Sequence, residues 1–212
     1  MAKKRILLKV GTNTLTKETD QISRGKIEDI GRQISKLKDH YEFIIVSSGA
    51  IAAAKQFVKL EHNGQEINVK QALAAIGQPH LMRIFQENFR ELGLFTSQCL
   101  LSYSDFEKPE SQENIKNTIN VLVANNFIPI INENDTVSTD EIQFGDNDKL
   151  AALDAALLQV DLLLIATNTD GIYTKTSITE GNPKTIARVN DIDELKKEIS
   201  LEKSSQGTGG MQ

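Results

Sequence analysis

The sequence predicts an α/β fold in which a mainly parallel sheet lies between layers of helices. Short apolar runs alternate with longer segments in which apolar residues recur every three or four positions, the pattern of strands joined by helices. Three of these runs contain almost no polar residue, at 42–47, 126–132 and 161–167. Such runs are typical of parallel strands that are covered on both faces. We therefore expect helices on both sides of one sheet.

The expected strands and helices alternate strictly along the chain. Strands are expected at residues 5–10, 42–47, 93–101, 126–132 and 161–167. Helices are expected between them, at residues 24–40, 68–92, 111–126 and 146–160. In the first helix Ile27, Ile30 and Ile34 form an apolar stripe, and the last helix opens with acids, which the helix dipole favours. Gly77 and Pro79 lie inside the second helix and predict a kink or a break.

Composition is that of an ordinary globular protein, with room in 212 residues for one large domain or two small ones. The chain has 24 basic and 29 acidic residues and no basic stripe, which argues against a nucleic-acid surface. Cys99 is the only cysteine, which favours a reducing compartment and a packing role for this residue. No apolar run resembles a signal peptide or a membrane span, so we expect a cytoplasmic protein.

Polar residues that follow the strands form the candidate site, because open α/β sheets bind ligands at the carboxyl ends of their strands. Lys9 and the segment 11–14 follow the first strand, and residues 47–50 follow the second. The acidic segment 131–150 follows the fourth strand, and residues 167–171 follow the fifth. Taken singly, each is better explained as a turn or a helix cap. Together, small residues, hydroxyl groups and a lysine at several strand ends indicate a phosphate site.

Other sites of known pattern find no support in the sequence. The Walker motif and the G-x-G-x-x-G motif are both missing, and the spacing after Asp146 does not fit a calcium-binding loop. The histidines at 40, 62 and 80 lack the spacing of metal ligands, and no Ser/His/Asp or Cys/His arrangement can be inferred. The metal ligands are therefore left unassigned.

Five segments, taken together, resemble the amino acid kinase family, and in particular its glutamate 5-kinase branch. They occur in order over essentially the whole chain: LLKVGTNTLT, IIVSSGAIAAAK, QALAAIGQPHLM, IPIINENDTVSTDEIQFGDNDKLAA and GTGGMQ. The resemblance implies a three-layer αβα sandwich around a mostly parallel sheet of about eight strands. It implies one amino acid kinase domain over residues 1–212, without a PUA domain.

The resemblance also implies an activity and its partners. The activity is ATP-dependent phosphorylation of the γ-carboxylate of L-glutamate to L-glutamyl 5-phosphate, the first step of proline synthesis. Magnesium, a homo-oligomeric state and feedback inhibition by proline belong to the same family picture. The alternatives are a kinase for another carboxylate or a carbamate, and a non-catalytic sensor of amino acids or nucleotides. The presence of both Lys9 and Asp148 weighs against the sensor.

Residue roles follow from the same resemblance. Lys9 matches a lysine that contacts the nucleotide phosphates, and Asp148 matches the carboxylate that orients the catalytic lysines. The positions that match glutamate-binding residues, or adjoin them, are Ser48, Gly49, Asp135 and Asn147. The expected nucleotide-binding positions are Gly11, Thr167, Asn168, Thr208, Gly209, Gly210 and Met211.

Two features depart from the family pattern. Asn168 occupies a position where the family commonly has Asp. The family also places a second phosphate-binding lysine shortly after GTGGM, whereas the sequence ends at Gln212. We therefore expect the nucleotide-binding part to be truncated in this sequence.

The resemblance suggests cationic partners for the acidic segment, which holds six carboxylates before Lys149. Crowded carboxylates repel one another unless positive charge lies among them. Asp135 is expected to receive the ammonium group of glutamate, Asp148 to hold Lys9, and a metal ion to draw on the same cluster. Asn147 is expected to donate to a substrate carboxylate. The other acids, Glu133, Asp140 and Glu141, are expected to be solvated.

Overall fold

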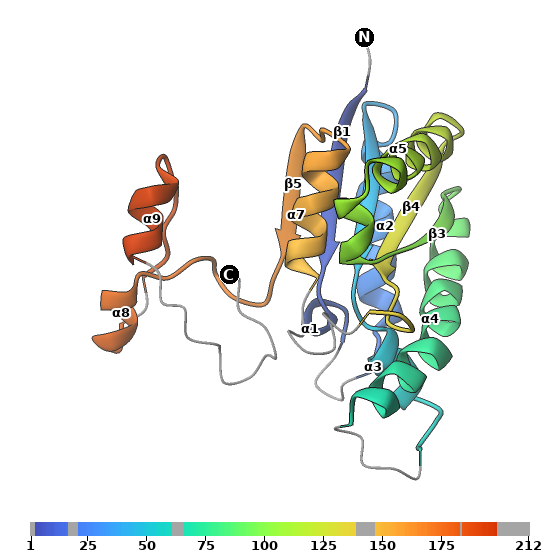
Figure 1. Ribbon diagram of the computed structural model, residues 1–212, viewed down its shortest axis with the longest axis horizontal. Helices are drawn as coiled ribbons and strands as arrows, with labels where there is room; N and C mark the ends of the chain where they lie inside the picture. Colours follow the sequence, from blue (N-terminus) through green and yellow to red (C-terminus); the bar gives the residue numbers. More distant parts are fainter. Residues whose placement is uncertain (1–2, 17–20, 61–65, 139–146, 183, 199–212) are drawn as a thin grey trace.

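The computed structural model describes residues 3–16, 21–60, 66–138, 147–182 and 184–198 (Figure 1). Five parallel strands form one sheet in the order β3-β4-β2-β1-β5. They are β1 (Lys4–Val10), β2 (Tyr41–Ser47), β3 (Phe95–Leu101), β4 (Phe127–Glu133) and β5 (Leu162–Ala166). All five expected strands are confirmed. The described residues supply five strands, fewer than the approximately eight that the family resemblance implies.

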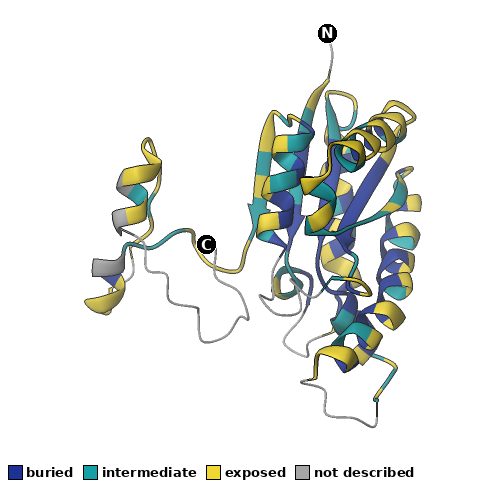
Figure 2. Ribbon diagram, viewed as in Figure 1, coloured by how far each residue is buried: buried dark blue, intermediate teal, exposed yellow. Residues whose placement is uncertain are grey.

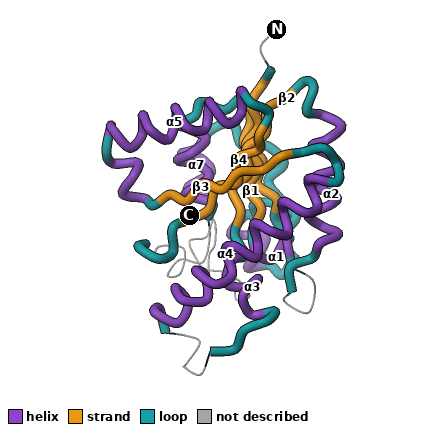
Figure 3. Tube along the Cα trace, turned by 90° about the vertical axis from the view of Figure 1, so that its right-hand side faces the viewer, coloured by secondary structure: helices purple, strands orange, loops and turns teal. Residues whose placement is uncertain are grey.

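Helices cover both faces of the sheet, as Figure 3 shows in a view turned by 90°. One layer contains α1 (Thr12–Leu15), α2 (Arg24–Leu37), α3 (Ala50–Lys55) and α4 (Ile67–Arg90). The opposite layer contains α5 (Pro109–Ala124) and α7 (Asp148–Leu157), with a short 3-10 helix, η1 (Tyr103–Glu107), before α5. The three-layer α/β architecture is therefore confirmed.

The alternation of side chains along β1 explains why its sequence is apolar on both faces. Ile6 and Val10 pack in the cluster with α2 and α4, whereas Leu7 packs with α5 and α7. Both clusters are buried, and Figure 2 shows the buried residues concentrated along the central strands. Lys9 is two residues beyond Leu7 and therefore lies on the α5 and α7 side of the sheet.

The helix α4 runs without interruption through Gly77 and Pro79, so the predicted break is wrong. A Cβ added to Gly77 would lie 1.8 Å from the carbonyl oxygen of Ala50, so this glycine permits the close contact of α3 with α4. Pro79 removes the hydrogen bond to the carbonyl of Ala75. Ala75 and Pro79 are both exposed, so water can replace that bond.

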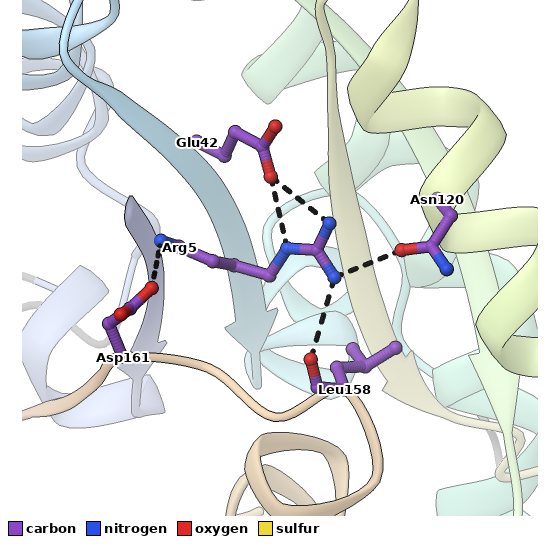
Figure 4. A network of polar contacts seen from close by, with 5 residues as sticks. All are labelled: Arg5, Glu42, Asn120, Leu158 and Asp161. Carbon is purple, nitrogen blue, oxygen red and sulfur yellow. Dashed lines mark hydrogen bonds and ion pairs between the residues drawn. The ribbon is translucent and has the colours of Figure 1, made fainter. Parts of the chain in front are cut away.

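Arg5 connects several elements at the N-terminal ends of the strands (Figure 4). Its guanidinium donates to Glu42 Oε2 at 3.0 and 3.1 Å, to Asn120 Oδ1 at 3.0 Å and to the Leu158 carbonyl at 3.5 Å. Its backbone N–H donates to Asp161 Oδ2 at 2.7 Å. This network joins β1 to β2, α5, the end of α7 and the start of β5.

The last described segment carries the short helices α8 (Lys175–Thr179) and α9 (Ile192–Glu198). Figure 1 shows both helices to one side of the sandwich, beyond β5. No described helix is both long and apolar enough to cross a lipid bilayer.

Candidate active site

The carboxyl ends of β1, β2, β4 and β5 bring the predicted site residues to one edge of the sheet. Parallel register places Val10 beside Ser47 and beside Ala166. The N–H of Ser48 donates to the Val10 carbonyl at 3.1 Å, and Thr14 Oγ1 donates to the Ala166 carbonyl at 3.0 Å. These bonds fix the loops after β1 and β2 against each other and against the end of β5.

Lys9 and Asp148 form a largely buried ion pair at this edge. The Lys9 Nζ lies 2.5 Å from Asp148 Oδ1, and the two side chains are only 8% and 17% exposed. Asp148 is the first residue of α7, where the helix dipole favours a carboxylate. The desolvation energy of a buried ion pair is often as large as the energy gained from the attraction between its charges. A buried ion pair at a strand end therefore favours a functional role over a stabilising one.

Gly11 leaves room beside this ammonium group. A Cβ added at Gly11 would lie 3.3 Å from Lys9 Nζ. Any side chain at this position would crowd the ammonium group, whereas glycine does not. The position predicted to contact nucleotide thus adjoins the lysine predicted to contact phosphate.

Asp135 is a buried carboxyl group with an unusual proton affinity. Burial, together with the negative charge of Glu133, raises the pKa of Asp135 from 3.8 to about 7. Its Oδ1 is buried and has no hydrogen-bond partner among the described residues. A cationic ligand would stabilise the ionised form and lower this pKa again.

Glu133 is only 1% exposed, so the expectation that it is solvated is wrong. As the last residue of β4 it lies within the sheet, and it accepts a hydrogen bond from the hydroxyl of Ser138. A polar residue at the end of an apolar strand was the available signal for a buried site residue. Asp140 and Glu141 lie outside the described residues.

Asn147 presents a hydrogen-bond acceptor at the site. Its amide nitrogen donates to the Ser47 carbonyl at 3.2 Å and to Asn132 Oδ1 at 2.7 Å, which uses both hydrogens. Asn147 is fully buried, and its Oδ1 has no partner among the residues described. In this arrangement Asn147 offers an acceptor to a ligand, and its predicted role as a donor to a substrate carboxylate stays a prediction.

Ser48 and Gly49 complete the predicted substrate side. Ser48 is 3% exposed, and its Oγ is buried without a hydrogen-bond partner in the described part of the chain. Gly49 has φ of 109°, a left-handed conformation that favours glycine, and a Cβ there would lie 3.1 Å from Ile22 Cδ1. The glycine therefore allows the sharp turn that directs Ser48 inward.

The unpaired atoms of Ser48, Asp135 and Asn147 are the strongest indication of a ligand. Nearly all buried polar groups in folded proteins have a hydrogen-bond partner, and each exception needs an explanation. Three of the exceptions coincide with the positions that the resemblance assigns to glutamate, whereas others, such as Gln56 Nε2, Thr96 Oγ1 and the Asp154 carboxyl group, lie at positions with no predicted role. Of the three that coincide, two are acceptors, and the third is a hydroxyl that can donate or accept.

The predicted nucleotide positions are only partly described. Thr167 and Asn168 are exposed and follow β5, next to the end of β1. Thr167 Oγ1 lies 3.1 Å from Thr169 Oγ1. Thr208, Gly209, Gly210 and Met211 lie outside the described residues. No group of three or more His, Cys, Asp or Glu side chains in the described part of the chain could hold a metal ion.

Two site residues were not predicted from the sequence, Gln78 and Asn132. Asn132 is 1% exposed and accepts from Asn147, and Gln78 is 8% exposed and accepts from Asn132 Nδ2 at 2.9 Å. Asn132 ends an otherwise apolar run, and Gln78 interrupts the apolar face of α4. Both are polar residues at positions where an apolar residue is expected, which is the signal that could have identified them.

Comparison with known proteins identifies the family to which the chain belongs. Residues 4–212 match the amino acid kinase family, and the chain belongs to that family. It is 40% identical over 210 residues to the glutamate 5-kinase of Geobacter sp. (strain M21), which covers 98% of this chain and 56% of that protein. It is 41% identical to glutamate 5-kinase 2 of Bacillus subtilis (strain 168), over 98% of this chain and 57% of that protein. The chain thus spans little more than half the length of these two relatives.

Solved structures show the same fold at low sequence identity. An isopentenyl phosphate kinase superposes with a TM-score of 0.57 and 14% identity, covering 91% of this chain and 83% of its own. The carbamate kinase of Giardia superposes with a TM-score of 0.55 and 16% identity, covering 81% and 78%. At these identities the likeness concerns the fold alone.

Proposed function

We propose that the protein transfers the γ-phosphoryl group of ATP to the γ-carboxylate of L-glutamate, giving L-glutamyl 5-phosphate for proline synthesis. The observation that carries this proposal is the set of buried, unpaired polar atoms of Ser48, Asp135 and Asn147, which lie at the same ends of the strands as the Lys9–Asp148 pair. Relatives named glutamate 5-kinase, about 40% identical over nearly the whole chain, support the choice of glutamate.

The acceptors on the substrate side suit an amino acid. The ammonium group of glutamate would donate to Asp135 Oδ1 and Asn147 Oδ1, both buried and unpaired among the described residues. Ionised Asp135 supplies the opposite charge, and a charge-assisted bond is stronger than a neutral one. The hydroxyl of Ser48 would donate to a carboxylate oxygen. These contacts orient the γ-carboxylate toward Lys9.

Phosphoryl transfer requires alignment and charge neutralisation more than covalent participation by the protein. A γ-carboxylate oxygen attacks the γ-phosphorus, and the bond from that phosphorus to the β,γ-bridging oxygen breaks to release ADP. The γ-carboxylate is already ionised at neutral pH, so no general base is needed. Lys9 neutralises charge on the transferring group, which is typically worth about 3–4 kcal/mol. Asp148 holds the ammonium group in place.

ATP fits the nucleotide side in two respects. Lys9 supplies a cation, and Gly11 places no side chain against it. The described residues offer no group that could hold Mg²⁺ by itself. Mg²⁺ commonly binds through substrate phosphates and one or two carboxylates, so we propose it as a companion of ATP and assign it no protein ligand. Roles for Thr167, Asn168 and the segment Thr208–Met211 stay predictions.

Other family properties stay proposals for this chain. They are a homo-oligomeric state, inhibition by proline, a cytoplasmic location, and a single domain over residues 1–212. Proline carries an ammonium group and an α-carboxylate as glutamate does, so it can use the same acceptors. We therefore expect any inhibition by proline to be relieved by excess glutamate.

A hydroxamate assay tests the proposed reaction. The full-length protein is incubated with ATP, Mg²⁺, L-glutamate and hydroxylamine, which converts an acyl phosphate to a coloured hydroxamate. L-Aspartate replaces glutamate in one control, and Lys9→Ala replaces the wild type in another. We expect colour with glutamate and loss of about 100-fold or more in Lys9→Ala. Colour with aspartate but not with glutamate would reject the substrate, and an active Lys9→Ala would reject the role of Lys9.

A further inference from the structure

A chain of side-chain amides leads from helix α4 to the substrate side of the site. Gln78 Nε2 lies 3.5 Å from Gln98 Oε1 on β3, and Gln78 Oε1 accepts from Asn132 Nδ2 at 2.9 Å. Asn132 Oδ1 accepts in turn from Asn147 Nδ2 at 2.7 Å. The chain ends at the unpaired Asn147 Oδ1, which faces no other partner among the described residues. In Gln98, Gln78 and Asn132 the amide oxygen points toward the amide nitrogen of the next residue in the series.

Backbone groups fix the direction of this chain. The N–H of Glu133 donates to Asn132 Oδ1 at 2.9 Å, and a backbone N–H can only donate. The carbonyl of Ser47 accepts from Asn147 Nδ2 at 3.2 Å, and a carbonyl can only accept. Rotating either amide by 180° would set donor against donor or acceptor against acceptor. The orientation of both asparagines therefore follows from the backbone.

Gln78 completes the chain from the opposite side. The backbone fixes Asn132 Oδ1, so the amide nitrogen of Asn132 points the other way and needs an acceptor. Gln78 Oε1 is that acceptor. Gln78 is 8% exposed, so water does not easily replace it. Its place is set by the close packing of α4 on α3, which Gly77 permits. Removing this acceptor leaves a buried donor unsatisfied and favours a shift of Asn132 and, with it, of Asn147.

We propose that Gln78 is a positioning residue for amino-acid recognition. It acts through Asn132 to hold Asn147 with its carbonyl oxygen toward the ammonium group of the substrate. This inference rests on the proposed function, since it assigns the amino-acid side of the same site. Gln78 does not touch the reacting atoms. Its loss should weaken recognition of the ammonium group and leave ATP binding unchanged.

Glutarate provides the sharpest test, because it is glutamate without the ammonium group. We would measure kcat/KM for glutamate and for glutarate, and KM for ATP, in the wild type and in Gln78→Met. This substitution keeps the length of the side chain but removes the amide oxygen that accepts from Asn132. The preference for glutamate over glutarate should fall about tenfold in Gln78→Met. The KM for ATP should not change. If Gln78 had a merely structural role, the variant would lower kcat/KM for glutamate and for glutarate by the same factor. That result would overturn the proposal.

Two further variants separate positioning from stability. Gln78→Glu keeps an oxygen that can accept from Asn132, so it should retain the wild-type preference, and it decides the question if Gln78→Met does not fold. Loss of the preference in a folded Gln78→Glu would contradict the proposal. Asn88→Met is the matched control, because Asn88 lies on the same helix and donates to the Ile84 carbonyl at 2.7 Å outside the amide chain. It should keep the full preference.

The outcome for the wild type distinguishes this inference from the proposed function. If the wild type does not use glutamate, the proposed function fails. The Gln78 comparison is then made with the amino acid that the protein does use and with its deaminated analogue. If the wild type prefers glutamate but the Gln78 variants discriminate as it does, only the present inference fails.

Discussion

Lys9 on β1 and Asp148 on α7 meet at a distance of 2.5 Å, although 138 residues separate them in sequence. The pair joins the end of the second strand from the sheet edge to the first turn of a helix that covers it. In the proposed mechanism Asp148 acts through Lys9, so removing both side chains should cost little more activity than removing the lysine alone. We expect Lys9→Ala and Asp148→Asn each to lower kcat by about 100-fold or more, with a strongly non-additive double variant. Additive losses would show that Asp148 acts independently of Lys9.

Asp135 should make glutamate use pH-dependent near neutrality. Its raised pKa of about 7 means that the free protein holds the carboxyl protonated below pH 7 and ionised above it. Only the ionised form pairs with an ammonium charge, so kcat/KM for glutamate should rise with pH and level off above about 7. Below that pKa the slope should approach about tenfold per pH unit. The Asp135→Asn variant should lose activity and this dependence together, and a wild-type profile that stays flat from pH 6 to 8 would contradict the assignment.

Asp154 should make the folded protein less stable as pH rises. It is fully buried, and both its carboxyl oxygens lack hydrogen-bond partners among the described residues. Burial raises its pKa from 3.8 to about 8. Between these values the folded state holds a proton that the unfolded state has released, so the free energy of unfolding falls as pH rises from about 4 to about 8. Denaturation with urea at pH 5 and pH 8 should show a smaller loss in Asp154→Asn than in the wild type.

The exposed Asp29 offers a matched control for that measurement. Asp29→Asn removes a carboxyl group from the surface of α2 and should leave the pH dependence as in the wild type. If Asp154→Asn also behaves as the wild type, Asp154 is not the group responsible. Cys99 reports on the same region, because burial and the charge of Asp154 raise its pKa to about 11. Its thiol therefore stays protonated near neutral pH, in agreement with a packing role.

Gly77 and Gly25 should respond in opposite directions to the same substitution. Gly77→Ala would place a Cβ 1.8 Å from the Ala50 carbonyl oxygen, and neither backbone can yield without parting α3 from α4. We expect a loss of about 3 kcal/mol in the free energy of unfolding. Gly25→Ala meets only Ser23 Oγ at 3.9 Å and should stabilise α2 by about 0.5–1 kcal/mol. Thermal melts of the two variants give the comparison, and equal shifts would refute the packing role of Gly77.

The sequence predicted the strands well because both faces of the sheet are covered. Buried parallel strands leave continuous apolar runs, and these mark β2 and β4. The edge strand β5 has the same apolar sequence, but Leu162 and Leu164 are exposed, so the expectation that both its faces are covered is wrong. The continuity of α4 could not be predicted in this way. Whether a helix tolerates Gly77 and Pro79 depends on what each residue faces, and only the packed structure shows the carbonyl of Ala50 on one side and solvent on the other.

For the site, the sequence likewise predicted where residues lie but not the contacts that depend on distant parts of the chain. Lys9, Ser48, Asp135 and Asn147 could be placed at strand ends because topology alone brings such ends together. The direction of the Asn147 amide could not, since it depends on the Ser47 carbonyl and on Asn132, partners far apart in sequence. The burial of Glu133 depends likewise on the length to which β4 extends.

The burial of both faces of β1 affects which interactions determine the register of this strand with its neighbours. Where only one face of a strand is apolar, a shift by one residue exposes the core and is strongly disfavoured. In β1 both faces are apolar, so the same shift would still bury Ile6, Leu7 and Val10 in one cluster or the other. The shift would nevertheless be unfavourable, because it would separate Arg5 from Glu42 at one end of the strand and Lys9 from Asp148 at the other. The ion pair of Lys9 with Asp148 therefore favours one alignment of β1, in addition to the role that we propose for Lys9 in phosphoryl transfer.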